Sequence, residues 1–245
     1  MKLLSTNAKL SKTAGGAADY LAAGLTLAPA SLSGHNVCPG STAGCRAACL
    51  AHYSGQRVTP GARAKALRDT LRFFDDRAGF LADLERDIAA HVRRAEKHRL
   101  TPIIRLNVGS DIDWLSTIER WSSVQFYDYT KISSRYRRYL AGQLPSNYAI
   151  TFSASERTTD EQLRDILAAG GNVATVFNVA YNGQRKIYGA LPQCVTLAGG
   201  SFPVVDGDLH DIRLPQIDGR GVVVGLRLKG TNAAKDGARA HLFAK

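Results

Sequence analysis

Six short apolar runs in the middle and last parts of the chain constrain its fold more than any other feature. Their centres lie about 20 to 29 residues apart. This spacing leaves room for a helix in most intervals, which is the pattern of strand–helix–strand units built around a parallel sheet. The predicted strands cover residues 103–108, 124–128, 148–152, 173–177, 202–205 and 222–226.

Helices are predicted both before and within this series of strands. Residues 60–74 and 77–99 form two helical stretches, and the second carries an apolar stripe at helical spacing: Phe80, Leu81, Leu84, Ile88 and Val92. Residues 158–169 begin with two threonines and two acidic residues and end before Gly170, which are signals for the start and the end of a helix. A further short strand is predicted near residues 24–28.

The length of 245 residues suits one α/β barrel, and no linker rich in proline, glycine or serine divides the chain. We therefore predict a single α/β domain over residues 1–245, in the form of a full or partial TIM-like (β/α) barrel. An open doubly wound sheet is the alternative. It is less favoured because no glycine-rich turn follows the first strand.

Polar residues follow most of the predicted strands. Right-handed crossovers run all the strands in one direction, so the loops after them meet at one face, where α/β proteins place their sites. The residues predicted to bind a ligand there are Asn107, Asp111, Asp128, Lys131, Glu156 and Lys229. Their neighbours at this face are Ser110, Tyr129, Thr130, Ser153, Ser155, Arg157, Asn178, Asp206, Asp208 and Asp211. The structural alternative is that such residues cap the next helix.

Three cysteines lie within twelve residues, from Cys38 to Cys49, in a C-x6-C-x3-C arrangement. Three thiolates from one loop can bind three irons of a cubane cluster, and the small residues between them let the backbone bend close to it. Cys45 and Cys49 are four residues apart, so the start of a helix would place both sulfurs on one face. The loop predicts an iron–sulfur cluster, of the 4Fe-4S type, at the carboxyl-terminal mouth of the strands.

Other interpretations of the cysteines stay open. A zinc site usually has closer cysteine pairs, and buried structural cysteines suit a loop rich in glycine and serine poorly. Cys194 is expected in a loop on the same face, where it would be the fourth ligand. If it is not, one iron is open to a ligand, as in radical S-adenosylmethionine enzymes, although their usual loop is C-x3-C-x2-C.

The charge of the chain bears on its partners. A formal net charge of +11 favours attraction to polyanions. The sharpest basic and aromatic cluster is residues 135–139, whereas the basic residues of the predicted helices are explained by a solvated face. We expect a small anionic or nucleotide-like ligand beside the cluster, with nucleic acid as an alternative partner.

The location and the reaction class are less constrained. The N-terminus turns polar before it can supply a signal core, and no stretch is long enough to cross a bilayer, so we expect a cytoplasmic protein. No Walker loop, zinc-protease helix, nucleophile elbow or kinase signature occurs in the sequence, and an enzymatic role is left open. Substrate and oligomeric state do not follow from the sequence.

Several sequence blocks occur together in a fixed order. They are residues 34–40 with Cys45 and Cys49, 105–107 with 110–114, 126–131, 147–148 with 152–156, 205–208 with 211–213, and 224–230. Over nearly the whole chain these blocks resemble the phage "gene product 88"-like family, which is encoded by actinobacteriophages and other phages or prophages. The resemblance implies a phage protein in the host cytoplasm and carries no function. The expected role is redox, sensing or radical-SAM-like chemistry; the alternative is a basic nucleic-acid-binding protein with a structural cluster or zinc site.

Overall fold

The computed structural model describes residues 2–6, 10, 17–50, 59–182, 185, 187–241 and 244. The strands are β1 (Leu4–Ser5), β2 (Tyr20–Leu25), β3 (Thr101–Arg105), β4 (Gln125–Thr130), β5 (Tyr148–Ser153), β6 (Val173–Phe177), β7 (Tyr181–Asn182), β8 (Ile187–Tyr188), β9 (Cys194–Leu197), β10 (Gly200–Asp206) and β11 (Val223–Arg227). The helices are α1 (Ala43–Ala47), α3 (Pro60–Asp75), α4 (Arg77–Lys97), α5 (Leu115–Arg120), α6 (Ser133–Leu140), α7 (Asp160–Ala168), α8 (Pro215–Asp218) and α9 (Asn232–Ala240).

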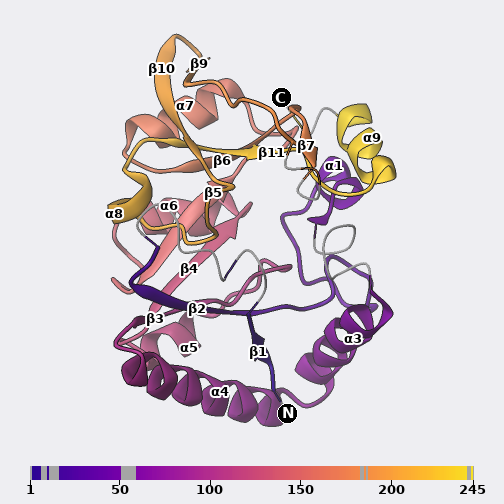
Figure 1. Cartoon of the computed structure of the whole chain (residues 1–245), viewed down its shortest axis with the longest axis vertical. Helices are drawn as coiled ribbons and strands as arrows, with labels where there is room; N and C mark the ends of the chain where they lie inside the picture. Colours follow the sequence, from indigo (N-terminus) through magenta and orange to yellow (C-terminus); the bar gives the residue numbers. More distant parts are fainter. Residues whose placement is uncertain are drawn as a thin grey trace.

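Nine strands form one sheet in the order β1-β2-β3-β4-β5-β6-β11-β10-β9 (Figure 1). The strands from β2 to β10 in this order are parallel, whereas β1 and β9 pair antiparallel at the two edges. The predicted α/β class is confirmed. A full barrel is not what the described residues form, because β11 inserts between β6 and β10 and a short β9–β10 hairpin ends the sheet instead of a strand that returns to β1.

Most of the predicted elements are present with small shifts at their ends. The exception is the strand expected at residues 24–28, because β2 spans Tyr20–Leu25 and the chain leaves the sheet after Leu25. Within the described part of the chain, none of the helices has both the length and the apolar character needed to cross a membrane.

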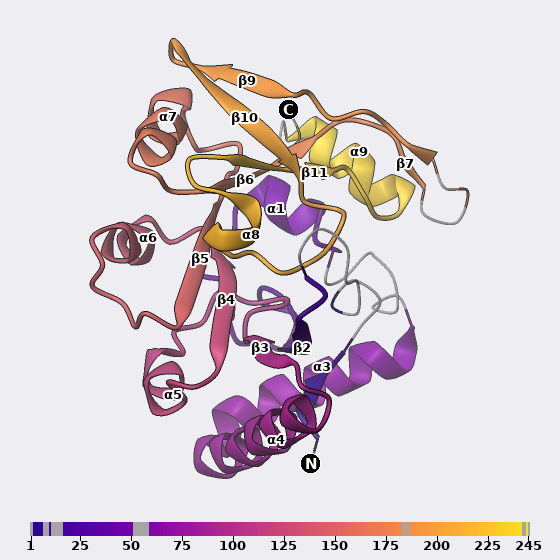
Figure 2. The ribbon, with the colours of Figure 1, turned by 60° about the vertical axis from the view of Figure 1, so that its left-hand side comes forward.

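The outer face of the sheet is covered by helices α4, α5, α6 and α7 (Figure 2). Apolar side chains of these helices, such as Ile88, Ile118 and Leu163, share one buried core with Phe126 and Ile150 of the strands. The stripe predicted for residues 77–99 accounts for this packing, since Phe80, Leu84 and Ile88 are its fully buried members. The helices therefore hold the strand ends in place from one side.

The inner face is filled by the segment that joins β10 to β11. Its Ile212 and Leu214 pack with Ile103 and Tyr127 of the sheet in a second, smaller apolar cluster. The same segment carries α8, which lies in front of β5 in Figure 2. A connection thus occupies the concave side, which leaves the carboxyl ends of the strands as the accessible edge.

Candidate metal centre at the carboxyl ends of the strands

The cysteine loop lies directly against the carboxyl ends of β3 and β4. The backbone N–H of Asp111 donates to the carbonyl of Val37 at 2.8 Å. Gly40 approaches the end of β4 so closely that a Cβ at this position would lie 2.9 Å from Cβ of Lys131. Only glycine allows this approach without a shift of one segment. The placement predicted for the loop, at the mouth of the strands, is therefore observed.

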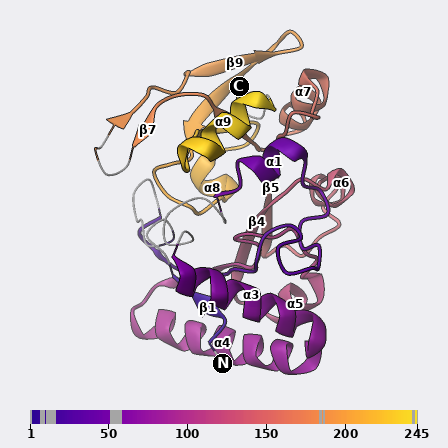
Figure 3. The same cartoon turned by 90° about the vertical axis from the view of Figure 1, so that its right-hand side faces the viewer.

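Glu156, from the loop after β5, holds the other end of the cysteine loop. Its carboxylate accepts hydrogen bonds from the Thr42 hydroxyl at 2.7 Å and from the Gly44 N–H at 2.9 Å. Thr42 is the N-cap of α1, because its hydroxyl accepts from the Cys45 N–H at 3.2 Å. Burial raises the pKa of Glu156, but these hydrogen bonds outweigh it and leave the pKa below its usual value. Glu156 thus fixes the start of α1, which carries Cys45 (Figure 3).

The thiols of the loop interact with one another. All four cysteines of the chain are free, and Cys38, Cys45 and Cys49 are partly buried. Burial raises the pKa of Cys38 to about 12, and the neighbouring Cys49 and Cys45 add to this effect. A neutral Cys38 thiol donates to the carbonyl of Gly109 at 3.4 Å. A bound metal would have to displace this proton, since coordinated thiols are deprotonated.

The three cysteines are gathered but not yet arranged as ligands. Across the residues that the structure describes, no group of three His, Cys, Asp or Glu side chains has the geometry of a metal site. A site here therefore requires the thiols to turn towards a common centre.

Cys194 lies elsewhere in the fold. The sequence predicted it in a loop, but it begins the edge strand β9 and is exposed. Strands β6, β11 and β10 separate β9 from β5 in the sheet order. At the usual spacing between strands this corresponds to roughly 19 Å along the sheet. The structure does not bring Cys194 next to the loop of the other three.

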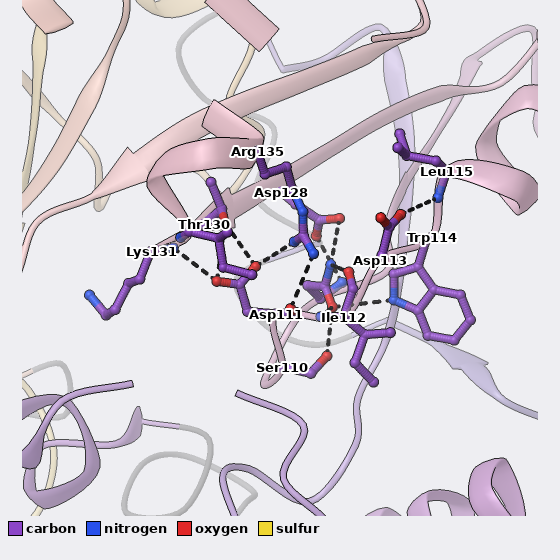
Figure 4. Close-up of polar contacts among 12 residues, drawn as sticks. Ser110, Asp111, Ile112, Asp113, Trp114, Leu115, Asp128, Thr130, Lys131 and Arg135 are labelled. Atoms are coloured by element: carbon purple, nitrogen blue, oxygen red, sulfur yellow. Dashed lines mark hydrogen bonds and ion pairs between the residues drawn. The ribbon is translucent and has the colours of Figure 1, made fainter. Parts of the chain in front are cut away.

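Asp111 is the centre of a buried polar network beneath the loop (Figure 4). Its carboxylate accepts from the Thr130 hydroxyl at 2.9 Å, from the Lys131 N–H at 2.9 Å and from a guanidinium nitrogen of Arg135 at 2.6 Å. Burial raises the pKa of Asp111, and the charge of Arg135 is the main opposing influence. Asp111 therefore joins β3, β4 and α6 at the point where the cysteine loop is attached.

Asn107 and Asp128 have a structural role under the same surface. The N–H and the side-chain amide of Asn107 donate to Asp128 at 2.8 and 3.1 Å. The amide oxygen of Asn107 accepts from the Ser110 hydroxyl at 2.8 Å and from the Trp114 indole at 3.2 Å. Both side chains are buried and use their polar atoms to shape the loop after β3. Asn107 and Asp128 support the site from below instead of lining it.

The buried carboxylate of Asp128 predicts a pH-dependent stability. Burial raises its pKa from 3.8 to about 7, although Arg105 and the hydrogen bonds from Asn107 oppose this. The folded state thus binds the proton more tightly, and the contribution of Asp128 to stability is lost as the pH rises from about 4 to about 7. Urea unfolding of the wild type and Asp128→Asn checks this: the wild type should lose stability relative to the variant over that range. A difference independent of pH would contradict the assignment.

Lys229 belongs to a second charged cluster at the ends of β10 and β11. Its ammonium pairs with Asp208 and lies 4.5 Å from the centre of the Tyr181 ring. Beside it, Arg227 pairs with Asp206 at 2.8 Å. These partners give Lys229 a structural explanation that is independent of any ligand.

Residues 135–139 were predicted as a contact for nucleic acid, and the structure splits this run. Arg135 is buried against Asp111, and the hydroxyl of Tyr136 donates to the carbonyl of Asn172 at 2.9 Å. Only Arg137 and Arg138 of this run are exposed. Arg135 and Thr42 are the residues of the site that sequence reasoning missed. For Arg135, the signal was its position in the first turn of the helix after a strand-end lysine.

Comparison with known proteins identifies one relationship. A family model with the description "Gene product 88" matches residues 1–242. No curated protein and no solved structure matches the chain.

Proposed function

Since the chain belongs to the gene product 88 family of phage proteins, we propose that it is a phage-encoded iron–sulfur protein of the host cytoplasm. Cys38, Cys45 and Cys49 hold a 4Fe-4S cluster, and its role is redox or sensing chemistry. One observation carries the proposal. The three thiols come from one short loop that is attached to the carboxyl ends of three neighbouring strands, the edge where α/β proteins place their sites.

The residues present fit such a group in their chemistry. Thiolates are the usual ligands of iron–sulfur clusters, and three are available here within mutual electrostatic reach. The loop that carries them is held by hydrogen bonds to Asp111 and Glu156, so its two ends are fixed while the thiols can still turn. Lys131 lies against Gly40 and supplies positive charge beside the thiolates. When bound, the cluster supplies one-electron chemistry.

The test is the iron content of single cysteine variants. We expect Cys38→Ser, Cys45→Ser and Cys49→Ser each to lose most of the iron that the wild type holds after anaerobic purification. Cys194→Ser is the matched control, because its thiol is exposed on the edge strand β9. It should keep the wild-type content, which leaves the fourth iron open to a small anionic ligand. Wild-type iron in all three loop variants would contradict the proposal, and iron loss in Cys194→Ser would make it the fourth ligand.

The net charge of +11 supports a second candidate function. In it, the chain binds nucleic acid and the thiols hold a structural cluster or zinc. Binding to single- or double-stranded DNA should then weaken steeply as the salt concentration rises, because phosphate contacts release counterions. Affinity that does not change with salt would rule out this mode, and a colourless protein with bound zinc would favour zinc over iron.

A further inference from the structure

Lys131 has a fixed position beside the cysteine loop. It follows β4 directly, and its N–H donates to Asp111 at 2.9 Å. Its Cβ faces the Cα of Gly40, where an added Cβ would come within 2.9 Å. The backbone of Lys131 is therefore held on one side by Asp111 and covered on the other by the loop.

The ammonium group of Lys131 is also held. Its side chain extends away from Asp111 (Figure 4) and crosses to the end of β5. There it donates to the Ser153 hydroxyl at 2.8 Å, the Ser153 carbonyl at 3.2 Å and the Ala154 carbonyl at 2.9 Å. A long and usually mobile side chain has one position here, because three neutral oxygen atoms surround its charge.

Thiols and carboxylates lie close enough to act on this charge. Burial lowers the pKa of Lys131, and four neighbouring groups oppose that effect: Cys45, Asp111, Glu156 and Cys38. The thiol of Cys45 has the largest influence of the four. Two of the three proposed ligands are thus electrostatically coupled to one fixed ammonium group.

We propose that Lys131 is a positioning residue for the cluster site, whose fixed positive charge makes a cluster held by Cys38 and Cys45 easier to reduce. This inference rests on the proposed function. Reduction adds one negative charge, and a cation held nearby stabilises the more negative state. A charge that donates its hydrogen bonds to neutral carbonyl and hydroxyl groups acts on the site without leaving it.

The experiment compares the reduction potentials of three reconstituted variants with that of the wild type. Lys131→Met removes the charge and the hydrogen bonds, Lys131→Gln removes the charge but keeps an amide donor, and Lys131→Arg keeps the charge. In an anaerobic redox titration, both neutral variants should have more negative potentials, so that the ratio of reduced to oxidised cluster at a fixed poise falls about tenfold. Lys131→Arg should stay near the wild type, and so should Ser153→Ala, which removes one acceptor only.

The outcomes separate the two proposals. A wild-type protein that holds no iron and sulfide after reconstitution refutes the proposed function. A wild type with a cluster, together with neutral variants of unchanged potential, refutes only the role of Lys131. If the neutral variants lose the cluster, retention in Lys131→Arg supports the charge effect, whereas loss in all three variants shows a purely structural role and overturns it.

Discussion

Replacing Arg135 with methionine should lower the free energy of unfolding by about 3–5 kcal/mol. Its guanidinium group pairs with Asp111 at 2.6 Å, and both side chains are about 10% exposed. The substitution leaves the Asp111 carboxylate buried without its main positive partner. Breaking one side of a buried ion pair costs more than removing both sides, because the remaining charge is neither solvated nor neutralised. Chemical unfolding of the two proteins at pH 7 measures the difference.

The controls for this prediction come from the same helix. Arg138→Met changes an exposed arginine of α6 and should alter stability by no more than about 0.5 kcal/mol. The double variant Arg135→Met/Asp111→Asn should recover part of the loss, since it removes both charges while the amide oxygen still accepts from Thr130 and Lys131. If Arg135→Met is as stable as Arg138→Met, the network under the cysteine loop does not hold that loop in place.

Arg213→Met is expected to have an effect of similar size, about 3–5 kcal/mol, on the inner face of the sheet. The side chain of Arg213 is fully buried and pairs with Asp218 at 3.1 Å. It also donates to the carbonyl of His210 at 2.8 Å and to that of Asp211 at 3.3 Å. These bonds shape the segment that fills the concave side, so their loss should loosen the packing of Ile212 against the sheet.

Thermal and urea unfolding measure this second loss, with Arg220→Met as the matched control. Arg220 follows α8 in the same connection but is exposed, so its replacement should change little. A loss below about 1 kcal/mol in Arg213→Met would mean that the segment between β10 and β11 contributes little to the stability of the fold.

The central strands and the long helices follow from local sequence patterns. The run at residues 173–177 coincides with β6, and the stripe at 77–99 matches α4 within two residues at its end. Continuous apolar runs and helical stripes report burial directly, and burial in a parallel sheet depends mainly on local composition. Strand order depends on pairing between distant segments, so the insertion of β11 between β6 and β10 has no local signal.

The candidate site was predictable in part for the same reason. Parallel strands bring their carboxyl ends to one edge, and this rule correctly placed Asp111, Lys131 and Glu156 beside the cysteine loop. It could not distinguish a side chain that lines the site from one that supports it, such as Asp128, because that depends on which face of the strand is buried. Cys194 was misplaced because β9 pairs antiparallel on an edge that no periodicity marks.

Acid-labile sulfide, measured together with iron and zinc in anaerobically purified wild-type protein, tests the central claim most directly. Three loop thiolates at the ends of β3, β4 and β5 should hold a brown species that contains iron and sulfide in equal amounts, close to four of each per chain for a 4Fe-4S cluster. Protein that contains zinc without sulfide, or that contains no metal both as purified and after reconstitution, would contradict the claim.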